Sequence, residues 1–204
     1  MSGSHRQFPD DSVVHVINRG NERRLLFAGD EDYAAFVGLL SWASARTDLR
    51  VVGYALMPNH WHLVLWPESI AQLSNFLQRL TSAHAAIFRR RSGTTGTGHV
   101  YQGRYRARLI GADLHYFHVL RYVEANPVRA RLVERAEGWR WSSAWERTTS
   151  PRILSEGPVP LPSIEDWLEL VNRPLTSTQA DAVRARRPRR GIGAACSAGP
   201  DSQM

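Results

Sequence analysis

In the first third of the chain, the spacing of apolar residues differs from segment to segment, and it predicts which segments are strands and which are helices. Residues 13–17 (VVHVI) are a short run of mainly β-branched side chains, which is typical of a strand. After Asp30, which we expect to cap a helix, apolar residues recur every three or four positions from Tyr33 to Ala43. Residues 50–57 and 60–66 are again strand-like, and the proline and asparagine between them predict a tight turn.

The same alternation of spacings continues through the middle of the chain. Ser69 begins a predicted helix that runs to Arg91, and residues 104–110 predict a fourth strand. The order strand–helix–strand–strand–helix–strand is that of the ferredoxin-like split motif, in which helices cover one face of an antiparallel sheet. A further helix is expected at residues 113–125. The predicted fold is therefore an α+β, ferredoxin-like sandwich with an added C-terminal helix that carries Tyr122.

Composition divides the chain into four segments. Residues 1–11 are expected to be a flexible N-terminus, and residues 12–147 to form the main domain. Residues 148–175 contain several prolines and predict an extension with a short helix at 163–171. Residues 176–204 are rich in arginine, proline, glycine and serine, which predicts a disordered basic tail.

The charge of the chain indicates its class of partner. The formal net charge is +7 and the sequence contains no lysine, so all 26 basic residues are arginines. An arginine guanidinium binds phosphate through two hydrogen bonds and stacks on bases, which favours a nucleic-acid partner. A genome rich in G+C would also explain the absence of lysine, but it would not explain the net charge.

Other features exclude several classes of protein. No apolar run approaches the roughly 18 residues that a membrane span requires, and the first residues lack the apolar stretch of a secretory signal. The single cysteine, Cys196, excludes an internal disulfide framework and a zinc site built from several cysteines. We therefore expect a cytoplasmic protein that contacts no membrane.

A pair of histidines is the first candidate for chemistry. In a strand, His60 and His62 face one side while Trp61 faces the other. Two imidazoles in this arrangement can chelate one divalent ion. The alternative is ordinary packing or surface exposure, which is the commoner role of two histidines on a strand.

A tyrosine and an asparagine on the last predicted helix form the second candidate. At about 100° per residue, Tyr122 lies about 160° from the centre of the apolar stripe around Leu120. Asn126 follows one turn later, and Pro127 is expected to end the helix at Asn126 and to free its side chain. The alternative interpretations are a surface tyrosine beside a terminal cap and a tyrosine packed on another element.

Together the two candidates describe one reaction. A tyrosine hydroxyl has a pKa of about 10 in a model peptide, so it needs help to attack a phosphodiester near neutral pH. A divalent cation supplies this help when it binds a non-bridging phosphate oxygen. The resulting phosphotyrosine retains the bond energy until another strand's hydroxyl resolves it, so the reaction needs no nucleotide cofactor.

Several short motifs place these residues in a wider pattern between residues 12 and 145. The motifs are VHVINRGN (14–21), YALMPNHWHL (54–63), YQGRY (101–105), RYVEANPVRA (121–130) and WRWSS (139–143). In their content and order they resemble the REP-associated tyrosine transposases, which are IS200-like members of the His-hydrophobic-His (HUH) class of single-tyrosine transposases.

This resemblance implies a site and a substrate. Tyr122 matches the nucleophile, and His60, His62 and Asn126 match the metal ligands, with Mg²⁺ or Mn²⁺ as cofactor. The implied activity is cleavage and rejoining of single-stranded DNA near imperfect palindromic hairpins, through a 5′-phosphotyrosine. Imidazole by itself favours zinc, copper or iron, so the resemblance alone supplies the choice of metal. It also implies a nucleoid-associated monomer, with a homodimer as the alternative.

Five arginines are candidates for DNA binding. Arg19 and Arg104 lie in the family motifs, whereas Arg106, Arg129 and Arg131 are chosen for their charge near the predicted site. Each could instead be an ordinary solvated or salt-bridged arginine. Residues 185–204 depart from the ending rich in arginine and glycine that relatives carry, so any function of that ending is in doubt here.

Two other functions stay open from the sequence. The same fold could bind nucleic-acid hairpins without cutting them, since ferredoxin-like sheets commonly bind single strands through their open face. A metal-dependent hydrolase that uses water as its nucleophile would share the histidines, but it would tolerate the change Tyr122→Phe.

Overall fold

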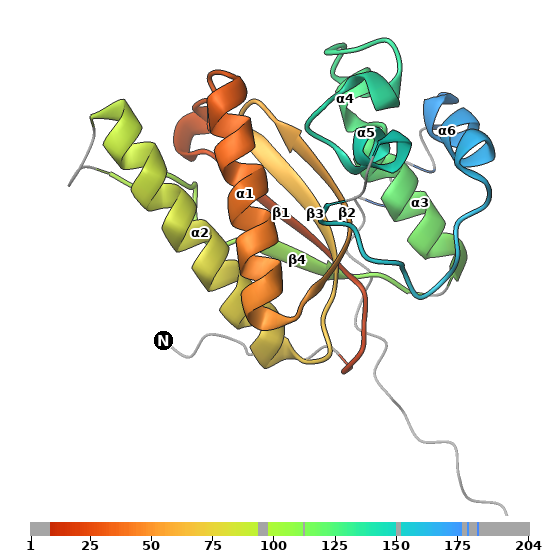
Figure 1. Ribbon diagram of the computed structural model, residues 1–204, viewed down its shortest axis with the longest axis horizontal. Helices are drawn as coiled ribbons and strands as arrows, with labels where there is room; N and C mark the ends of the chain where they lie inside the picture. The colour runs from red at the N-terminus through yellow and green to blue at the C-terminus, as the bar shows by residue number, and fades with distance from the viewer. Residues whose placement is uncertain are drawn as a thin grey trace, which may run out of the picture.

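The computed structural model describes residues 9–93, 98–111, 113–149 and 152–176, together with residues 179 and 183. Within these residues, four strands form one antiparallel sheet in the order β2-β3-β1-β4 (Figure 1). The strands are β1 (Val14–Arg19), β2 (Arg50–Met57), β3 (His60–Trp66) and β4 (Arg106–Leu109). The first strand thus lies between the third and the fourth, so the predicted α+β, ferredoxin-like arrangement is confirmed.

Helices cover both faces of this sheet (Figure 1). On one face lie the two long helices α1 (Asp30–Thr47) and α2 (Ile70–Ser92). The opposite face is covered by α3 (Asp113–Glu124), with α5 and α6 packed beside it. The remaining elements are η1 (Asn21–Arg23), α4 (Asn126–Arg129), η2 (Ala136–Gly138), α5 (Ser143–Thr148) and α6 (Ile164–Asn172).

The alternation of side chains along β3 divides the core into two layers. Trp61, Leu63 and Leu65 are buried against α1 and α2. Val64 points the other way and packs with the apolar residues of α3, among them Leu120. Because helices cover both faces, polar strand residues such as His15 and His62 are also buried.

The start of each long helix follows from a nearby side chain. Ser69 caps α2 as predicted, since its hydroxyl accepts a hydrogen bond from the backbone N–H of Gln72. The prediction that Asp30 caps α1 is wrong: Gly29 is the N-cap residue and makes no side-chain cap. The carboxylate of Asp32 instead accepts a hydrogen bond from the N–H of Ala28 at 2.9 Å, and this bond holds the chain that leads into the helix.

Two strands, β1 and β4, differ in length from the prediction, and the pairing of the sheet explains both differences. β1 extends to Arg19, two residues beyond the predicted end, because it pairs with β3 as far as His60. β4 is shorter than the predicted strand at 104–110, because only residues 106–109 pair with β1. The short helix predicted at 163–171 is present as α6.

Gly53 lies where α3 approaches the sheet most closely. The register between β2 and β3 shifts between Val51 and Gly53. A Cβ atom at residue 53 would lie 2.3 Å from Cδ1 of Leu120 and 3.4 Å from Oγ of Ser143. Only glycine therefore allows α3 to pack at this depth.

Most of the two predicted flexible ends lies outside the described residues. This holds for residues 1–8 of the N-terminus and for nearly all of the basic tail, including Cys196. Across the described part of the chain, no helix is both long enough and apolar enough to cross a bilayer.

Candidate active site

Three histidines meet on the face of the sheet that α3 covers. His60 and His62 share this face of β3, as strand alternation predicts, and their ring centroids are 5.0 Å apart. The third is His15 of the neighbouring strand β1, whose Nε2 lies 2.9 Å from Nδ1 of His62. His15 and His62 are buried and their rings stack. The site thus contains a histidine that sequence reasoning did not select.

The neighbours of His60 and His62 determine which nitrogen atoms can bind a cation. Nδ1 of His60 lies 2.7 Å from the amide oxygen of Asn59, which is an acceptor, so we assign the proton of His60 to Nδ1. We assign the proton of the 2.9 Å contact between His62 and His15 to Nδ1 of His62, which gives His62 the same tautomer. Both rings then present the lone pair of Nε2, and His15 orients His62 as an outer-shell partner orients a ligand.

Burial keeps all three imidazoles neutral near pH 7. Desolvation lowers the pKa of His15 to about 3 and the pKa of His60 to about 4. The pKa of His62 is well below its usual value of 6.5, first through burial, then through His15 and His60 and the charges of Arg129 and Arg19. Neutral imidazoles can bind a metal ion without first losing a proton.

The buried histidines should make the protein unstable in mild acid. His15, His62 and the core residue His84, whose pKa burial lowers to about 4, all have folded-state pKa values below 6.5. The unfolded chain therefore binds more protons below pH 6.5. The free energy of unfolding is therefore highest above pH 6.5. It falls as the pH decreases towards 4, by up to about 1.4 kcal/mol per pH unit for each histidine.

Urea unfolding at a series of pH values between 7.5 and 5 measures this effect. A His84→Phe variant, which removes one titrating group away from the site, should show a shallower dependence on pH. An unfolding free energy that does not change across this range would contradict the assignment of buried neutral histidines.

Tyr122 of α3 faces the histidines in the core layer between the sheet and α3. Its ring centroid lies 6.1 Å from that of His62 and 6.4 Å from that of His15. The guanidinium carbon of Arg129 lies 4.6 Å from the centre of the Tyr122 ring. Tyr122 is only 8% exposed, so the alternative of a surface tyrosine is wrong, whereas its packing on β1 and β3 agrees with the alternative of a tyrosine packed on another element. The polar side of α3 is covered as well as its apolar stripe, because the helix lies between the sheet and α6.

Asn126 occupies a different local structure from the one expected. Pro127 does not end helical structure at Asn126: α3 ends at Glu124, and residues 126–129 form the short helix α4. Proline is tolerated there because the first turn of a helix needs no N–H from it. The side chain of Asn126 is buried, and its Nδ2 donates to the carbonyl of Tyr122 at 2.8 Å. Its oxygen is the atom that a cation could bind.

The five candidate DNA-binding arginines differ in how close they lie to the histidines. Arg19, at the end of β1, and Arg129, above Tyr122, are close enough to the histidines to lower the pKa of His62. Arg104 and Arg106 are exposed at the β4 edge of the sheet. Arg131 is exposed just beyond α4, in a backbone conformation with a φ of 58°.

His60 and His62 are the two imidazoles that could bind one divalent ion, and the side-chain oxygen of Asn126 is the candidate third donor. No group of three or more histidine, cysteine, aspartate or glutamate side chains is placed to hold a metal among the described residues. A metal site built on His60 and His62 would therefore need a third ligand of another kind, for which the amide oxygen of Asn126 is the candidate. Two nitrogen ligands lie about 2.1 Å from a bound ion, and the short distance between His60 and His62 allows this.

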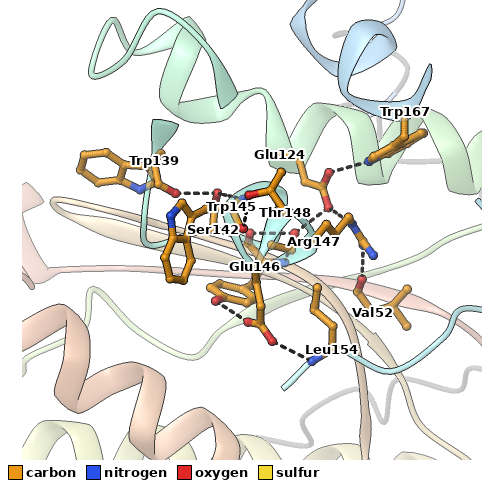
Figure 2. A network of polar contacts seen from close by, with 12 residues as sticks. Val52, Glu124, Trp139, Ser142, Trp145, Glu146, Arg147, Thr148, Leu154 and Trp167 are labelled. Atoms are coloured by element: carbon orange, nitrogen blue, oxygen red, sulfur yellow. Dashed lines mark hydrogen bonds and ion pairs between the residues drawn. The ribbon is translucent and has the colours of Figure 1, made fainter. Parts of the chain in front are cut away.

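A buried carboxylate holds the end of α3 against the sheet. Glu124 is fully buried, and three donors surround it (Figure 2). Its Oε1 accepts from Ser143 Oγ at 2.6 Å and from Arg147 Nε at 3.0 Å, and its Oε2 accepts from Trp167 Nε1 at 2.7 Å. Arg147 also donates to the carbonyl of Val52 at 2.7 Å. Glu124 thus connects the helix of Tyr122 to β2, α5 and α6.

A second buried carboxylate, in the same view, anchors α5 (Figure 2). One oxygen of Glu146 accepts from the hydroxyl of Tyr54 at 2.7 Å. The other accepts from backbone N–H groups of residues 152–154, the closest being Arg152 at 2.6 Å. The extension after residue 148 is therefore fixed to the sheet beside the helix that supports Glu124.

Comparisons with known proteins identify the family and the fold of the chain. The family of IS200-like transposases matches residues 10–126 of the 204-residue chain. A solved structure of a REP-associated tyrosine transposase bound to a REP hairpin is similar, with a TM-score of 0.54 and 17% identity, and the similarity covers 79% of this chain and 95% of that one.

A second solved structure, from Deinococcus radiodurans and assigned as a transposase, has a TM-score of 0.43 and 17% identity, over 60% of this chain and 96% of that one. A comparison with curated protein sequences gives no match. The family match includes β1, β3 and the tyrosine helix, and the first solved structure shares the fold. The chain therefore belongs to the IS200-like transposase family.

Proposed function

We propose that this transposase is a metal-dependent tyrosine enzyme that cleaves and rejoins single-stranded DNA near hairpins through a 5′-phosphotyrosine. The observation that carries the proposal is that Tyr122 and the histidines of β1 and β3 face one another within a single chain, with ring centroids 6.1 Å and 6.4 Å apart. The structurally similar transposase is bound to a REP hairpin, which supports a hairpin-forming DNA as the partner.

The proposed reaction is a transesterification at phosphorus. The Tyr122 oxygen attacks and loses its proton, a bond between phosphorus and that oxygen forms, and the bond to the 3′ oxygen breaks. The 3′ oxygen takes up a proton and leaves as a hydroxyl. Rejoining is the reverse reaction with the 3′ hydroxyl of another strand, so no external energy source is required.

The residues around Tyr122 have separate parts in this proposal. Mg²⁺ or Mn²⁺, held by His60, His62 and Asn126, would polarise a non-bridging phosphate oxygen. His15 keeps His62 in the required tautomer through the 2.9 Å hydrogen bond between them. Arg129 lies over the tyrosine ring, where its charge can offset the negative charge that develops on the phosphate.

Covalent trapping tests this function. The protein is incubated with single-stranded DNA that contains the imperfect palindromes flanking its own gene, with Mn²⁺ or Mg²⁺, and the mixture is run on a denaturing gel. We expect a protein band shifted by covalently bound DNA. Chelation of the metal with EDTA should reduce this band to background, and so should His62→Ala, because each removes the group that activates the phosphate.

His118→Ala is the matched control, because this histidine also lies on the α3 side of the molecule but is not one of the three clustered histidines. Its adduct should form at the wild-type level. Tight binding of hairpins with no adduct under any of these conditions would instead support the non-cleaving binding protein.

A further inference from the structure

A groove lies on the other side of the sheet from the histidines, between α2 and residues 99–105. Its volume is about 830 Å³, which is within the range of about 300–1,000 Å³ that small-molecule sites occupy. The α2 wall is a single stripe of the helix that includes Gln78, Thr81 and Arg89. Asn18 of β1 lies at its base. The groove is thus formed by parts of the chain that take no part in the histidine site.

The lining of this groove has an unusual composition for a surface cleft. Among the described residues that line it, amide and hydroxyl side chains predominate, two are arginines, and none is acidic. The arginines are Arg89 on the helix wall and Arg104 on the opposite wall, where Gln102 supplies a further amide. Guanidinium groups bind phosphate, and amides read base edges by hydrogen bonds, so this composition suits a nucleotide chain.

Arg89 has hydrogen-bonding capacity that the described residues do not use. Its Nη2 donates to the carbonyl of Gly98 at 3.2 Å. Its Nε is buried and has no hydrogen-bond partner among the described residues. A buried donor without an acceptor is costly, so it indicates a position where a ligand oxygen would be stabilising.

The walls of the groove are held in place before any ligand binds. The N–H of Gln102 donates to the carbonyl of Arg19 at 2.9 Å, which attaches this wall to the end of β1. The hydroxyl of Tyr101 lies 2.6 Å from Nδ1 of His84 and accepts from Nε1 of Trp61 at 3.3 Å. These contacts fix the segment to α2 and β3, so binding requires little ordering of the protein.

The groove and the histidine site lie on opposite faces of the sheet, and consecutive residues of β1 reach both. Asn18 and Arg19 are consecutive residues of β1, so their side chains point to opposite faces of the sheet. Asn18 lines the groove, whereas Arg19 pairs in register with His60. The exposed side chains of Arg104 and Arg106 lie along the edge between the two faces.

The geometry points to this groove as the binding site for an unpaired stretch of the DNA strand that is cut at Tyr122. The strand passes from the histidine site over the β4 edge and into the groove. Arg89 and Arg104 bind its phosphates there, and the amides of Gln78 and Gln102 contact its bases. The identity of the ligand as DNA rests on the proposed function, whereas the location and chemistry of the site rest on the groove itself.

Binding measurements without catalysis test this inference. The probes are a fluorescein-labelled short oligothymidylate and a blunt-ended DNA hairpin, and their affinities are measured by fluorescence anisotropy in EDTA. The change Arg89→Gln should weaken binding of the oligothymidylate about tenfold, since one phosphate contact is lost. Gln78→Glu, which places a carboxylate in the groove, should weaken it by a similar factor. Binding of the blunt hairpin should stay unchanged in both.

Matched variants separate the groove from a general effect of charge. Arg90→Gln removes the same charge from the neighbouring exposed position of α2, and Ala86→Glu adds the same charge to its solvent side. Both should bind the oligothymidylate within about twofold of wild type. Equal losses in the groove variants and in these controls would overturn the inference, and so would wild-type binding by both groove variants.

Photocrosslinking distinguishes this result from the outcome of the trapping assay. An oligonucleotide that carries iodouracil should crosslink to peptides that contain residues 99–105, and crosslinks confined to other peptides would overturn the groove. Because neither measurement requires cleavage, a failure to form the tyrosine adduct would remove the proposed function and leave the binding result to be judged separately.

Discussion

The change Tyr122→Phe is expected to abolish the covalent protein–DNA adduct, with a loss of strand cleavage on the order of 10⁴-fold or more. The substitution removes only the hydroxyl, and the remaining ring can still pack against His15 and His62 and beneath Arg129. Folding and hairpin binding should therefore stay close to wild type. The loss should appear as absence of the shifted band on a denaturing gel, with normal affinity in a native binding assay.

Tyr116 provides the matched control on the same helix. It is a buried tyrosine of α3 whose ring packs against Phe117 and is not among the ring contacts that the structure describes for His15, His60 or His62. Tyr116→Phe should form the adduct at the wild-type level. If Tyr122→Phe still cuts DNA without forming an adduct, the enzyme uses water as its nucleophile and is a hydrolase.

The change Glu124→Ala should destabilise the protein by about 3–5 kcal/mol, the usual cost of removing one partner from a buried ion pair. Arg147, whose side chain is 14% exposed, would lose the carboxylate that it contacts at 3.0 Å. The N–H of Trp167, which is fully buried, would lose its acceptor at the same time. Urea unfolding measures the effect, with adduct formation at low temperature as a second measurement on the molecules that fold.

The exposed pair of Arg173 and Glu169 serves as the control for the loss of a salt bridge. Both side chains are more than 60% exposed, so Glu169→Ala should change stability by less than about 1 kcal/mol. A similar small effect of Glu124→Ala would show that α3 does not depend on the buried carboxylate for its position.

The sequence contained enough information to predict the sheet and part of the site. The facing of His60 and His62 follows from the two-residue repeat of a strand, and the order of strands follows from the split motif. The first property depends only on the local repeat of a strand, and the second depends only on the order of the elements along the chain. For the same reason the one-turn separation of Tyr122 and Asn126 was visible in advance.

Other parts of the site depend on contacts between distant segments. His15 belongs to the site only because β1 lies beside β3, which brings together residues 47 positions apart. A signal was available, since His15 lies within a recognised motif on the strand expected to neighbour β3. Glu124 also lies in a recognised motif, but nothing local to that motif predicts its burial, because its three partners come from α5 and α6. The roles of Tyr122 and the metal ligands, and the five arginine contacts, stay predictions.

The histidines on the sheet and the tyrosine on α3 belong to one chain, and they already face each other. This arrangement has a genetic consequence. In the proposed mechanism, two defective copies, one that lacks Tyr122 and one that lacks His62, would not restore each other by pairing, whereas they could in a protein that exchanges its tyrosine helix between subunits.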